Sequence, residues 1–454
     1  MTRVLKLGGG CLRDGRSVAQ ACAVIAAERR SVAVVSAVSG VTETLLAAIE
    51  QAKRRPREVP AVLSMLESRH AAIIGELCPA GPARRLRREI AAQVAQAGRL
   101  LTGIACHRDL TQAVRARLLS FGERLAARLV AGVLASLGTP ALALDAHKAG
   151  VCTDGNYESA SIDRARTRRL LRPRVAPLLG QGVVPVIAGF FGRGPGGAVT
   201  LLGRNGSDYS AAAVAFALGA ERLEIWKDVP GFLSADPERV AQPRRLDRLS
   251  FAEAAELSYF GARILHPRTV EPLAGGRTRF FIRSMEDPAS PGTEIVAGRP
   301  GRAQDVAGIA ANERLAVLRV HGAGIGSKAG LLAGISARLA AAGINIHSVL
   351  TSQTSINFLL DPADGRSGMK LAKEAANGVI RRIELEERLA LVGVVGERIM
   401  EKEGIYARIF SAVARERINV EMAAAGASPV ACYFLVKRSD LDRAVRAVHE
   451  EFFP

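Results

Sequence analysis

Strand-like apolar runs alternate with helical stretches from the start of the chain to about residue 296. This order predicts an α/β region, because strands separated by helices pack into a mostly parallel sheet with helices on both faces. The segment from about residue 45 to 134 is almost entirely helical in pattern, with breaks at 56–60 and 79–82. We expect it to form a helical insertion packed on the sheet.

A polar stretch containing Gly and Pro at residues 297–302 marks the expected end of the α/β region. Beyond it the chain repeats itself at a spacing of 74 residues: Leu315, Gly330 and Asn345 recur as Leu389, Gly404 and Asn419. Both copies predict a strand, a glycine-bearing loop, a helix and another strand, so we expect two small tandem units. A duplicated dimerisation module without a ligand is the plain alternative.

The segment 202–212 joins a tight glycine turn to the start of a helix. Gly203 and Gly206 permit a sharp turn, and Ser207 or Asp208 can cap the helix that follows. The free N–H groups and the dipole at such a helix start favour a phosphate or a carboxylate. Taken alone, the segment also fits an ordinary strand-to-helix connection.

The start of the chain places a lysine beside a run of glycines. Residues 4–7 predict a short apolar strand that contains Lys6, and Gly8, Gly9 and Gly10 follow at once. Backbone amides in such a turn can approach a polyphosphate closely, and the lysine adds a mobile positive charge. The segment is not a P-loop, because its lysine precedes the glycines. The plain alternative is a buried strand whose lysine reaches out to solvent.

A second junction of this kind lies at residues 32–42, where an apolar run ends in hydroxyl side chains and a glycine before a helical stretch. Ligands in open parallel sheets bind at such strand ends. The two junctions therefore predict a ligand site at one edge of the sheet.

Composition narrows the class of protein. The chain has 454 residues, of which 48% are hydrophobic and 23% charged, and this is enough for two or three cores. Its net charge of +18 raises the question of nucleic-acid binding. The denser basic patches, at 53–55 and 84–88, fall in amphipathic helical stretches with few aromatic residues, which is typical of solvated faces. We therefore expect no nucleic-acid partner.

The sequence also favours a reducing cytoplasm. The first residues predict a charged strand rather than a signal peptide. The longest uncharged run, 175–192, carries Pro177 and Pro185, so we expect a helix end, a turn and the buried strand 183–188 rather than a membrane span. The six cysteines form no Cys-x-x-Cys pair, which indicates neither a zinc site nor a disulfide framework.

Four more motifs accompany these junctions in a fixed order. They are Ser-Phe-Gly-Glu at 120–123, Glu-Ile-Trp-Lys-Asp-Val-Pro-Gly at 224–231, Asp-Pro at 236–237 and Tyr-Phe-Gly-Ala-Arg-Ile-Leu-His-Pro-Arg-Thr at 259–269. In both order and spacing, essentially the whole chain resembles aspartate kinase, of the amino-acid kinase superfamily. The last of these motifs, together with Gly-Arg-Asn-Gly-Ser-Asp-Tyr-Ser-Ala at 203–211, is far more specific than any single glycine turn.

The resemblance implies three domains. An amino-acid kinase catalytic domain, a mostly parallel sheet between helices, would span 1–296, and two α+β ACT domains of ferredoxin-like fold would span 303–385 and 386–454. In the family one ACT unit is threaded through the other, so the two can be interleaved. ACT domains in this family bind an effector amino acid at domain interfaces, and the resemblance implies a homodimer formed through them, or a tetramer.

The implied reaction transfers the γ-phosphoryl group of ATP to the side-chain carboxylate of L-aspartate, giving 4-phospho-L-aspartate. This is the first step of lysine, threonine and methionine synthesis. A free carboxylate has a pKa near 4 and needs no general base at neutral pH, so catalysis must consist of positioning and charge neutralisation. Mg²⁺ would accompany ATP, held mainly by the phosphates, with no metal ligands supplied by the protein.

By the same resemblance, Lys6 would stabilise the transferring phosphoryl group and Asp208 would orient Lys6. Arg204 fits a bidentate clamp for a substrate carboxylate, and Glu123 fits an acceptor for the α-ammonium group. The remaining substrate-binding residues would be Ser36, Thr42, Phe190 and Ser207. The nucleotide-binding residues would be Lys6, Gly8, Gly9, Gly10, Lys227, Asp228, Leu233 and Arg263. Without the other motifs, Glu123 also reads as the exposed end of an otherwise apolar helix.

The chain departs from the family pattern mainly where the family grips the nucleotide. Gly10 stands where Thr or Ser is usual, Lys227 where Thr is usual and Leu233 where Tyr is common. Glu238 replaces an Arg and Arg263 a Lys. These exchanges remove hydroxyl and aromatic contacts, while Lys227 and Arg263 still offer positive charge and Arg239 can replace the arginine lost at position 238.

Two other functions stay open at this stage. One is a kinase for another acidic amino acid, such as glutamate or acetylglutamate, against which the motifs at 120–123 and 259–269 stand. The other is a catalytically silent sensor that keeps only its effector domains. The effector, lysine or threonine, would lie beside Asn345, Ser352 and Gln353, and the sequence does not decide between the two amino acids.

Overall fold

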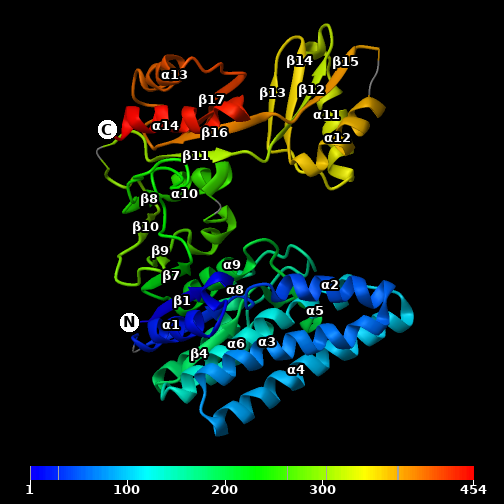
Figure 1. Cartoon of the computed structure of the whole chain (residues 1–454), viewed down its shortest axis with the longest axis vertical. Helices are drawn as coiled ribbons and strands as arrows, with labels where there is room; N and C mark the ends of the chain where they lie inside the picture. Colours follow the sequence, from blue (N-terminus) through cyan, green and yellow to red (C-terminus); the bar gives the residue numbers. More distant parts are fainter. Residues whose placement is uncertain (1, 29, 263, 303, 376–377) are drawn as a thin grey trace. The chain divides into compact units, whose positions relative to one another are not determined.

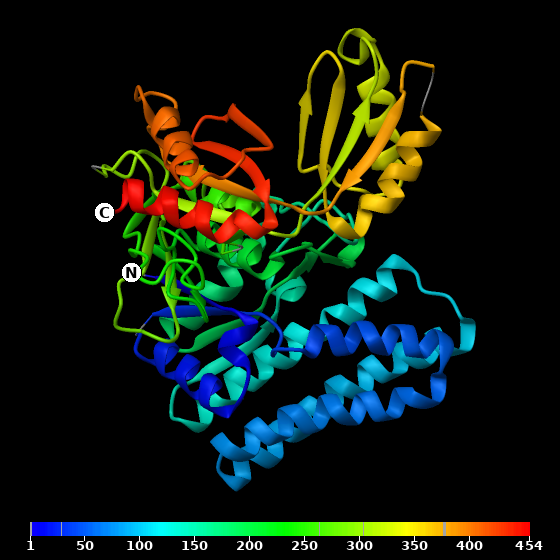
Figure 2. The same ribbon diagram turned by 45° about the horizontal axis from the view of Figure 1, so that its top comes forward.

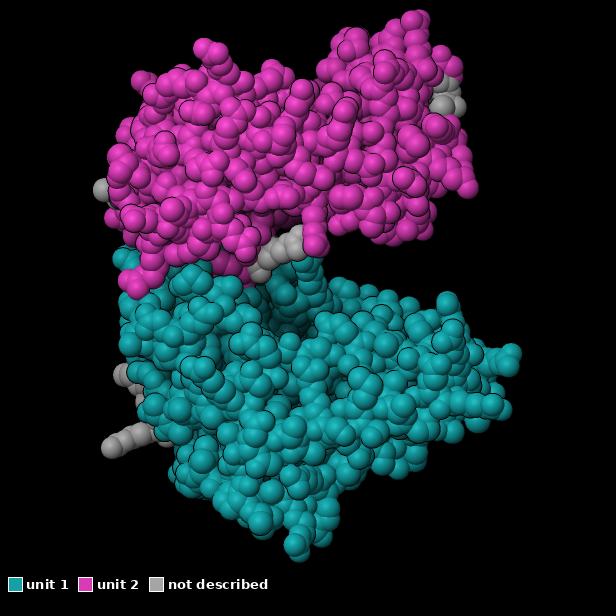
Figure 3. Space-filling view, viewed as in Figure 1, with its two compact units in different colours: residues 1–232, 247–251, 265–298 teal, residues 233–246, 252–264, 299–454 magenta. Residues whose placement is uncertain are grey.

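The computed structural model describes residues 2–28, 30–262, 264–302, 304–375 and 378–454. The chain forms two compact units, coloured teal and magenta in Figure 3. The first unit comprises residues 1–232, 247–251 and 265–298, and the second comprises 233–246, 252–264 and 299–454.

An eight-stranded sheet forms the centre of the first unit, in the order β3-β4-β2-β1-β7-β9-β10-β8. Every pairing in it is parallel except that of β9 with β10. The strands are β1 (Arg3–Leu7), β2 (Ser31–Val35), β3 (Ala141–Asp145), β4 (Val184–Ala188), β7 (Arg222–Lys227), β8 (Arg248–Ser250), β9 (Arg279–Ser284) and β10 (Thr293–Val296). Both β2 and β4 are buried along their whole length, as expected for the middle of a parallel sheet.

Helices cover this sheet, and several of them form the expected helical insertion (Figures 1 and 2). They are α1 (Gly15–Ala26), α2 (Val41–Arg54), α3 (Val59–Leu77), α4 (Ala80–His107), α5 (Gln112–Leu119), α6 (Phe121–Ser136), α7 (Ala146–Ala149), α8 (Arg164–Gly180) and α9 (Gly206–Leu218). Helices α2, α3 and α4 pack against one another, and α4 also packs on α6. The uncharged run at 175–192 contains the end of α8, a turn and β4. Among the residues described, no helix is both long and apolar enough to cross a membrane.

Left-handed backbone shapes the connections that follow the central strands. Gly40, before α2, has φ = 79°, and Gly203 has φ = 76°. Asn205, the residue before α9, adopts φ = 54°, a conformation that asparagine tolerates better than most residues. These tight connections bring the starts of α2 and α9 to the ends of the strands.

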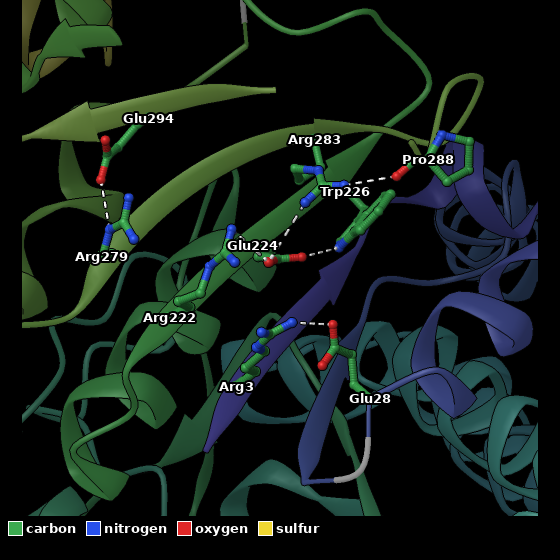
Figure 4. Close-up of polar contacts among 9 residues, drawn as sticks. All are labelled: Arg3, Glu28, Arg222, Glu224, Trp226, Arg279, Arg283, Pro288 and Glu294. Atoms are coloured by element: carbon green, nitrogen blue, oxygen red, sulfur yellow. Dashed lines mark hydrogen bonds and ion pairs between the residues drawn. The ribbon is translucent and has the colours of Figure 1, made fainter. Parts of the chain in front are cut away.

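A buried charge network covers one face of β7 and β9, and Figure 4 shows its members. Glu224, which is 2% exposed, lies 3.2 Å from Arg222 and 3.8 Å from Arg283. The indole N–H of Trp226 donates to the other carboxylate oxygen of Glu224 at 3.2 Å, and the Arg283 guanidinium lies 4.7 Å from the centre of the indole ring. The network therefore fixes Trp226, two residues along the same strand from Glu224.

Two antiparallel four-stranded sheets form the second unit, in the orders β13-β14-β12-β15 and β11-β16-β18-β17. The strands are β11 (Gly308–Asn312), β12 (Ala316–His321), β13 (Ser348–Thr351), β14 (Ser355–Leu360), β15 (Arg382–Glu386), β16 (Leu389–Val395), β17 (Met422–Ser428) and β18 (Ala431–Lys437). The helices are α10 (Phe251–Leu257), α11 (Leu331–Ala341), α12 (Pro362–Glu374), α13 (Ile405–Arg415) and α14 (Leu441–Phe452). The predicted fold class, an α/β region followed by two α+β units, is confirmed.

The sequence repeat has a conformational cause. Gly330 and Gly404 are the residues that precede α11 and α13, and both have left-handed backbone, with φ = 83° and φ = 80°. A side chain at either position would be strained there, which accounts for a glycine at the same place in both copies.

One strand crosses between the two repeats. Strand β11 precedes the first copy along the chain, yet it pairs with β16 of the second copy, with Ile309 opposite Val394. The first copy, β12 to β15, is thus inserted between two neighbouring strands of the other sheet. Residues 233–246 and 252–264, which we expected within the catalytic domain, belong to this second unit, where the Ile309 N–H donates to the carbonyl of Ser234 at 2.7 Å.

Candidate active site

A cavity of about 620 Å³ lies in the first unit where β1, β2 and β7 end and where α2 and α9 begin. Most of the residues expected at the site line this cavity. Those that line it are Lys6, Gly8, Gly9, Gly10, Ser36, Thr42, Glu123, Phe190, Arg204, Ser207, Asp208, Lys227 and Asp228.

The innermost pair is Lys6 with Asp208. Lys6 comes from β1 and Asp208 from the first turn of α9, and Lys6 Nζ lies 2.6 Å from Asp208 Oδ1. Both side chains are nearly buried, at 6% and 3% exposure. Burial alone would raise the pKa of Asp208, but Lys6 and Lys227 outweigh it and hold that pKa below its usual value. The carboxylate is therefore ionised and holds the lysine ammonium in place.

The glycine turn after β1 is built against the end of β7. The Gly8 N–H donates to the carbonyl of Trp226 at 3.2 Å, and the Cys11 thiol donates to the same carbonyl at 3.3 Å. A Cβ atom at Gly10 would lie 2.1 Å from Asp228 Oδ2, so any side chain at that position requires the Asp228 carboxylate to move. Burial raises the pKa of Cys11 to about 11, which keeps the thiol protonated at neutral pH.

Glu123 differs from Asp208 in that it forms no ion pair with a described residue, although the charge of Lys6 still acts on it. It lies in the first turn of α6 and is 5% exposed, and its Oε2 has no hydrogen-bond partner among the residues described. Burial raises its pKa to about 8, although a hydrogen bond from the backbone of Ala37 partly opposes the shift. A buried carboxyl group of this kind is suited to receive a cationic ligand group.

Arg204 and Phe190 border the same cavity from two loops. Arg204 is exposed on the turn before α9 and makes no ion pair or hydrogen bond with another residue that the structure describes. Phe190 has φ = 72°, which is unusual for a bulky residue, and its N–H donates to Ser210 Oγ at 3.3 Å. The guanidinium is thus available to a ligand carboxylate, on the turn just before the helix that carries Ser207.

Ser36 and Thr42 lie on either side of the connection from β2 to α2, and both border the cavity. The Ser36 N–H donates to the carbonyl of Leu7 at 3.0 Å, which ties the end of β2 to that of β1. Their hydroxyl groups add short polar contacts to the cavity wall.

The other expected residues that the structure describes are not among those that line this cavity. Leu233 belongs to the second unit, where it forms a β-bridge with Arg245, and Arg263 falls outside the described residues. Ser352 and Gln353 share the turn between β13 and β14, where Gln353 Nε2 donates to Ser327 Oγ at 3.0 Å.

Asn345 lies in the segment between α11 and β13, in the same repeat as that turn. The structure thus gathers the three expected effector residues into the first copy of the repeat.

Sequence reasoning missed an ion pair at the cavity. Arg115 Nη1 of α5 lies 3.1 Å from Glu158 Oε1, and both residues line the cavity. Forty-three positions separate them, and each stands in a stretch with no motif, so no local signal in the sequence could have found the pair.

Comparisons with known proteins agree with this geometry. The model of the amino acid kinase family matches residues 1–284, and an ACT domain model matches residues 392–452. The chain is 30% identical to aspartokinase 1, chloroplastic, of Arabidopsis thaliana over 100% of its own length and 80% of the relative. It is 32% identical to the lysine-sensitive aspartokinase 3 of Escherichia coli over 74% of its length and 75% of the relative.

Solved structures give the same result. The E. coli aspartokinase III in complex with lysine and aspartate, in the T-state, superposes with a TM-score of 0.85 at 29% identity over 100% of both chains. The same enzyme with aspartate and ADP, in the R-state, gives a TM-score of 0.82 at 28% identity, again over 100% of both chains. The resemblance inferred from the sequence motifs is confirmed.

Proposed function

The chain belongs to the amino acid kinase family, among its aspartokinases, and from that premise we propose how its cavity transfers the γ-phosphoryl group of ATP to the side-chain carboxylate of L-aspartate. One observation carries the proposal. A single cavity holds a buried lysine–carboxylate pair, Lys6 with Asp208, together with Glu123, a buried acid with one unpartnered oxygen among the described residues, and the available guanidinium of Arg204.

Aspartate carries three charged groups, and each of them needs a partner in the site. Glu123 would accept the α-ammonium group through its unpartnered carboxyl oxygen. Arg204 would clamp the α-carboxylate in bidentate fashion. Ser36, Thr42, Ser207 and Phe190 would complete the pocket and aim the side-chain carboxylate at the phosphate site. Glutamate is one methylene longer and would place its carboxylate differently against the same anchors.

The phosphoryl group would be received by Lys6 and by the amides of Gly8, Gly9 and Gly10. In this reaction the aspartate carboxylate must approach the negatively charged γ-phosphate. The positive charge of Lys6 stabilises the transition state, because negative charge is concentrated there. Asp208 keeps the ammonium of Lys6 oriented for this. No residue needs to act as a general base, because the attacking carboxylate is already ionised at neutral pH.

The turn fits a polyphosphate, because positions 8–10 carry no side chains that would fill the space beside the lysines. Among the described residues, no cluster of three or more His, Cys, Asp and Glu side chains is arranged to hold a metal ion. We therefore propose that Mg²⁺ enters with ATP on its phosphates, where it neutralises phosphate charge.

We further propose that the ACT units bind an effector amino acid through Asn345, Ser352 and Gln353, and that the protein acts as a cytoplasmic homodimer or a tetramer. Lysine is favoured as the effector, because one relative is named lysine-sensitive and a matching structure contains lysine. The product would enter lysine, threonine and methionine synthesis.

The test is ADP release by the purified protein with Mg-ATP, with hydroxylamine present to trap an acyl phosphate as a hydroxamate. L-Aspartate is compared with L-glutamate, N-acetylglutamate and no acceptor. Hydroxamate that forms only with aspartate supports the proposal. Turnover with another acceptor would reassign the substrate, and folded protein without any turnover would identify a catalytically silent sensor.

A further inference from the structure

Arg268, which stands in the last of the sequence motifs, joins two segments of the first unit. Its Nη2 donates to the carbonyl of Ala160 at 2.8 Å. Its Nη1 donates to Ser159 Oγ at 3.2 Å and to the carbonyl of Leu202 at 3.5 Å. We call residues 157–162 the flanking loop. One guanidinium therefore ties the flanking loop to the strand end that leads into the glycine turn before α9.

The flanking loop and this strand end are in direct contact. Strand β6 (Val199–Leu201) ends beside the loop, and the Ala160 N–H donates to the carbonyl of Leu201 at 2.8 Å. A Cβ atom at Gly203 would lie 3.3 Å from Ser159 Oγ. The glycine turn is thus packed against the loop that Arg268 holds.

Tyr209 holds the other end of the same turn. It lies in α9 and is 2% exposed, and its ring centre lies 4.8 Å from the guanidinium carbon of Arg268. Its hydroxyl accepts from the Ile162 N–H at 3.2 Å and donates to Glu271 Oε2 at 3.2 Å. The side chain of Arg268 therefore contacts the chain both before and after the turn.

The flanking loop also reaches the cavity. Glu158 belongs to the loop and lines the cavity, where it pairs with Arg115 at 3.1 Å. Arg268 itself is not among the residues that line the cavity. It therefore holds a part of the cavity wall from behind and leaves the space for a substrate free.

Arg204 stands in the turn between these two held ends. We propose that Arg268 is a positioning residue: by tying the flanking loop to the turn, it holds Arg204 in the direction in which its guanidinium clamps the α-carboxylate of aspartate. This inference rests on the proposed function and deepens it, because it concerns the substrate site of the same reaction.

The backbone of the turn explains why such support is needed. Both neighbours of Arg204 have left-handed backbone, with φ = 76° at Gly203 and φ = 54° at Asn205. Glycine permits many backbone conformations, so contacts from outside must fix the turn in one of them. A bidentate clamp acts only when its guanidinium points in one direction. The forked guanidinium of Arg268 can reach the two segments at once, which the single ammonium group of a lysine cannot do as well.

The experiment compares Arg268→Ala with Arg268→Lys, each made in the wild type and in an Arg204→Ala background. Arg174→Ala is the matched control, because Arg174 is an exposed arginine of the same unit that also donates to a backbone carbonyl, that of Lys148 at 2.8 Å. The hydroxamate assay gives kcat and the KM values for aspartate and ATP. Hydrogen–deuterium exchange of peptides covering 157–162 and 201–206 reports on the two segments without turnover.

We expect Arg268→Ala to raise the KM for aspartate about tenfold, with kcat and the KM for ATP within about threefold, because the clamp binds ground state and transition state alike. Arg268→Lys should fall between Arg268→Ala and the wild type. Exchange should become faster in both peptides of Arg268→Ala and stay unchanged in Arg174→Ala. In the Arg204→Ala background, Arg268→Ala should add less than about twofold, because no guanidinium is left to position.

A loss of about tenfold that persists in the Arg204→Ala background would overturn the inference, as would unchanged exchange or an unchanged KM for aspartate in Arg268→Ala. If Arg268→Ala does not fold, Ser159→Ala replaces it, because it removes one of the hydrogen bonds to Arg268. That variant should raise the KM for aspartate about threefold, and again only while Arg204 is present. A wild type without aspartate-dependent hydroxamate would refute the proposed function and the inference together, whereas the other outcomes concern the inference alone.

Discussion

The two sides of the cavity each contain a buried carboxyl group, and the pKa values of the two groups are shifted in opposite directions. On the phosphate side, Asp208 contacts Lys6 and Lys227, and its pKa lies below the usual value. On the acceptor side, Glu123 has an unpartnered oxygen, and burial raises its pKa to about 8. The comparison teaches that Asp208 finds its counter-charges within the chain, whereas Glu123 keeps an oxygen without a partner among the described residues, as the proposed binding of a ligand ammonium group there requires.

The two sides also differ in how closely they follow the family pattern. Glu123, Arg204 and Ser207 all match it, whereas Gly10 and Lys227 do not. If the phosphate side is indeed self-contained, changes there should act on kcat. Changes on the acceptor side should act on the use of aspartate.

The largest effect is expected at Lys6. Replacing Lys6 with Ala removes a charge that acts mainly in the transition state, so kcat should fall by about 1,000-fold or more while the fold persists. The hydroxamate assay measures the loss, and circular dichroism with thermal unfolding checks the fold. Near-wild-type turnover in a folded Lys6→Ala protein would remove Lys6 from the mechanism and with it the contrast between the two sides.

Arg204→Ala tests the acceptor side directly. Losing a charge-assisted pair should raise the activation free energy of the reaction with aspartate by at least about 2 kcal/mol, which lowers kcat/KM for aspartate roughly 30-fold. The KM for ATP should stay within about threefold of the wild-type value. Arg204→Lys serves as the matched variant, because it keeps the charge and loses the bidentate geometry, and it should fall between the two. An unchanged aspartate dependence in Arg204→Ala would take Arg204 out of the substrate site.

Gly10→Thr tests whether the phosphate side tolerates the residue that is usual in the family. Its Cβ would overlap the Asp228 carboxylate, so we expect about a tenfold loss in kcat/KM for ATP. The double variant Gly10→Thr with Asp228→Ala removes the overlap and should be less impaired than the sum of the two single changes predicts. Strict additivity would show that position 10 and Asp228 do not interact.

The sequence predicted the α/β region and the repeat, and it named most of the expected site residues that line the cavity, because each rests on local patterns or on motifs. Residue patterns alone could not predict which sheet β11 joins, since the apolar run Gly308–Asn312 suits either sheet and only long-range pairing with β16 decides; the expectation of interleaved units came from the family resemblance. The sequence also could not predict that Glu123 is buried, because an acidic residue in the first turn of a helix is equally compatible with an exposed position. The contact of Lys227 with Asp208 depends on the alignment of β7 with the start of α9, which no spacing along the chain reveals.

The smallest effect is a pH dependence that belongs to the acceptor side alone. In the free protein, burial keeps Glu123 mostly protonated below a pKa of about 8. The ammonium group of aspartate favours the ionised form, so binding below that pH must release a proton and is correspondingly weaker. With ATP saturating, kcat/KM for aspartate should therefore rise about fivefold from pH 7 to pH 8 and then level off.

Glu123→Gln should flatten this rise and lower its plateau, because the amide cannot ionise. The variant Lys227→Thr should keep the rise, because its charge lies on the other side of the cavity. A profile that is already flat in the wild type would mean that Glu123 is ionised before aspartate arrives. The two buried acids would then be in the same state, and the contrast between the two sides of the cavity would rest on their partners and not on their protonation.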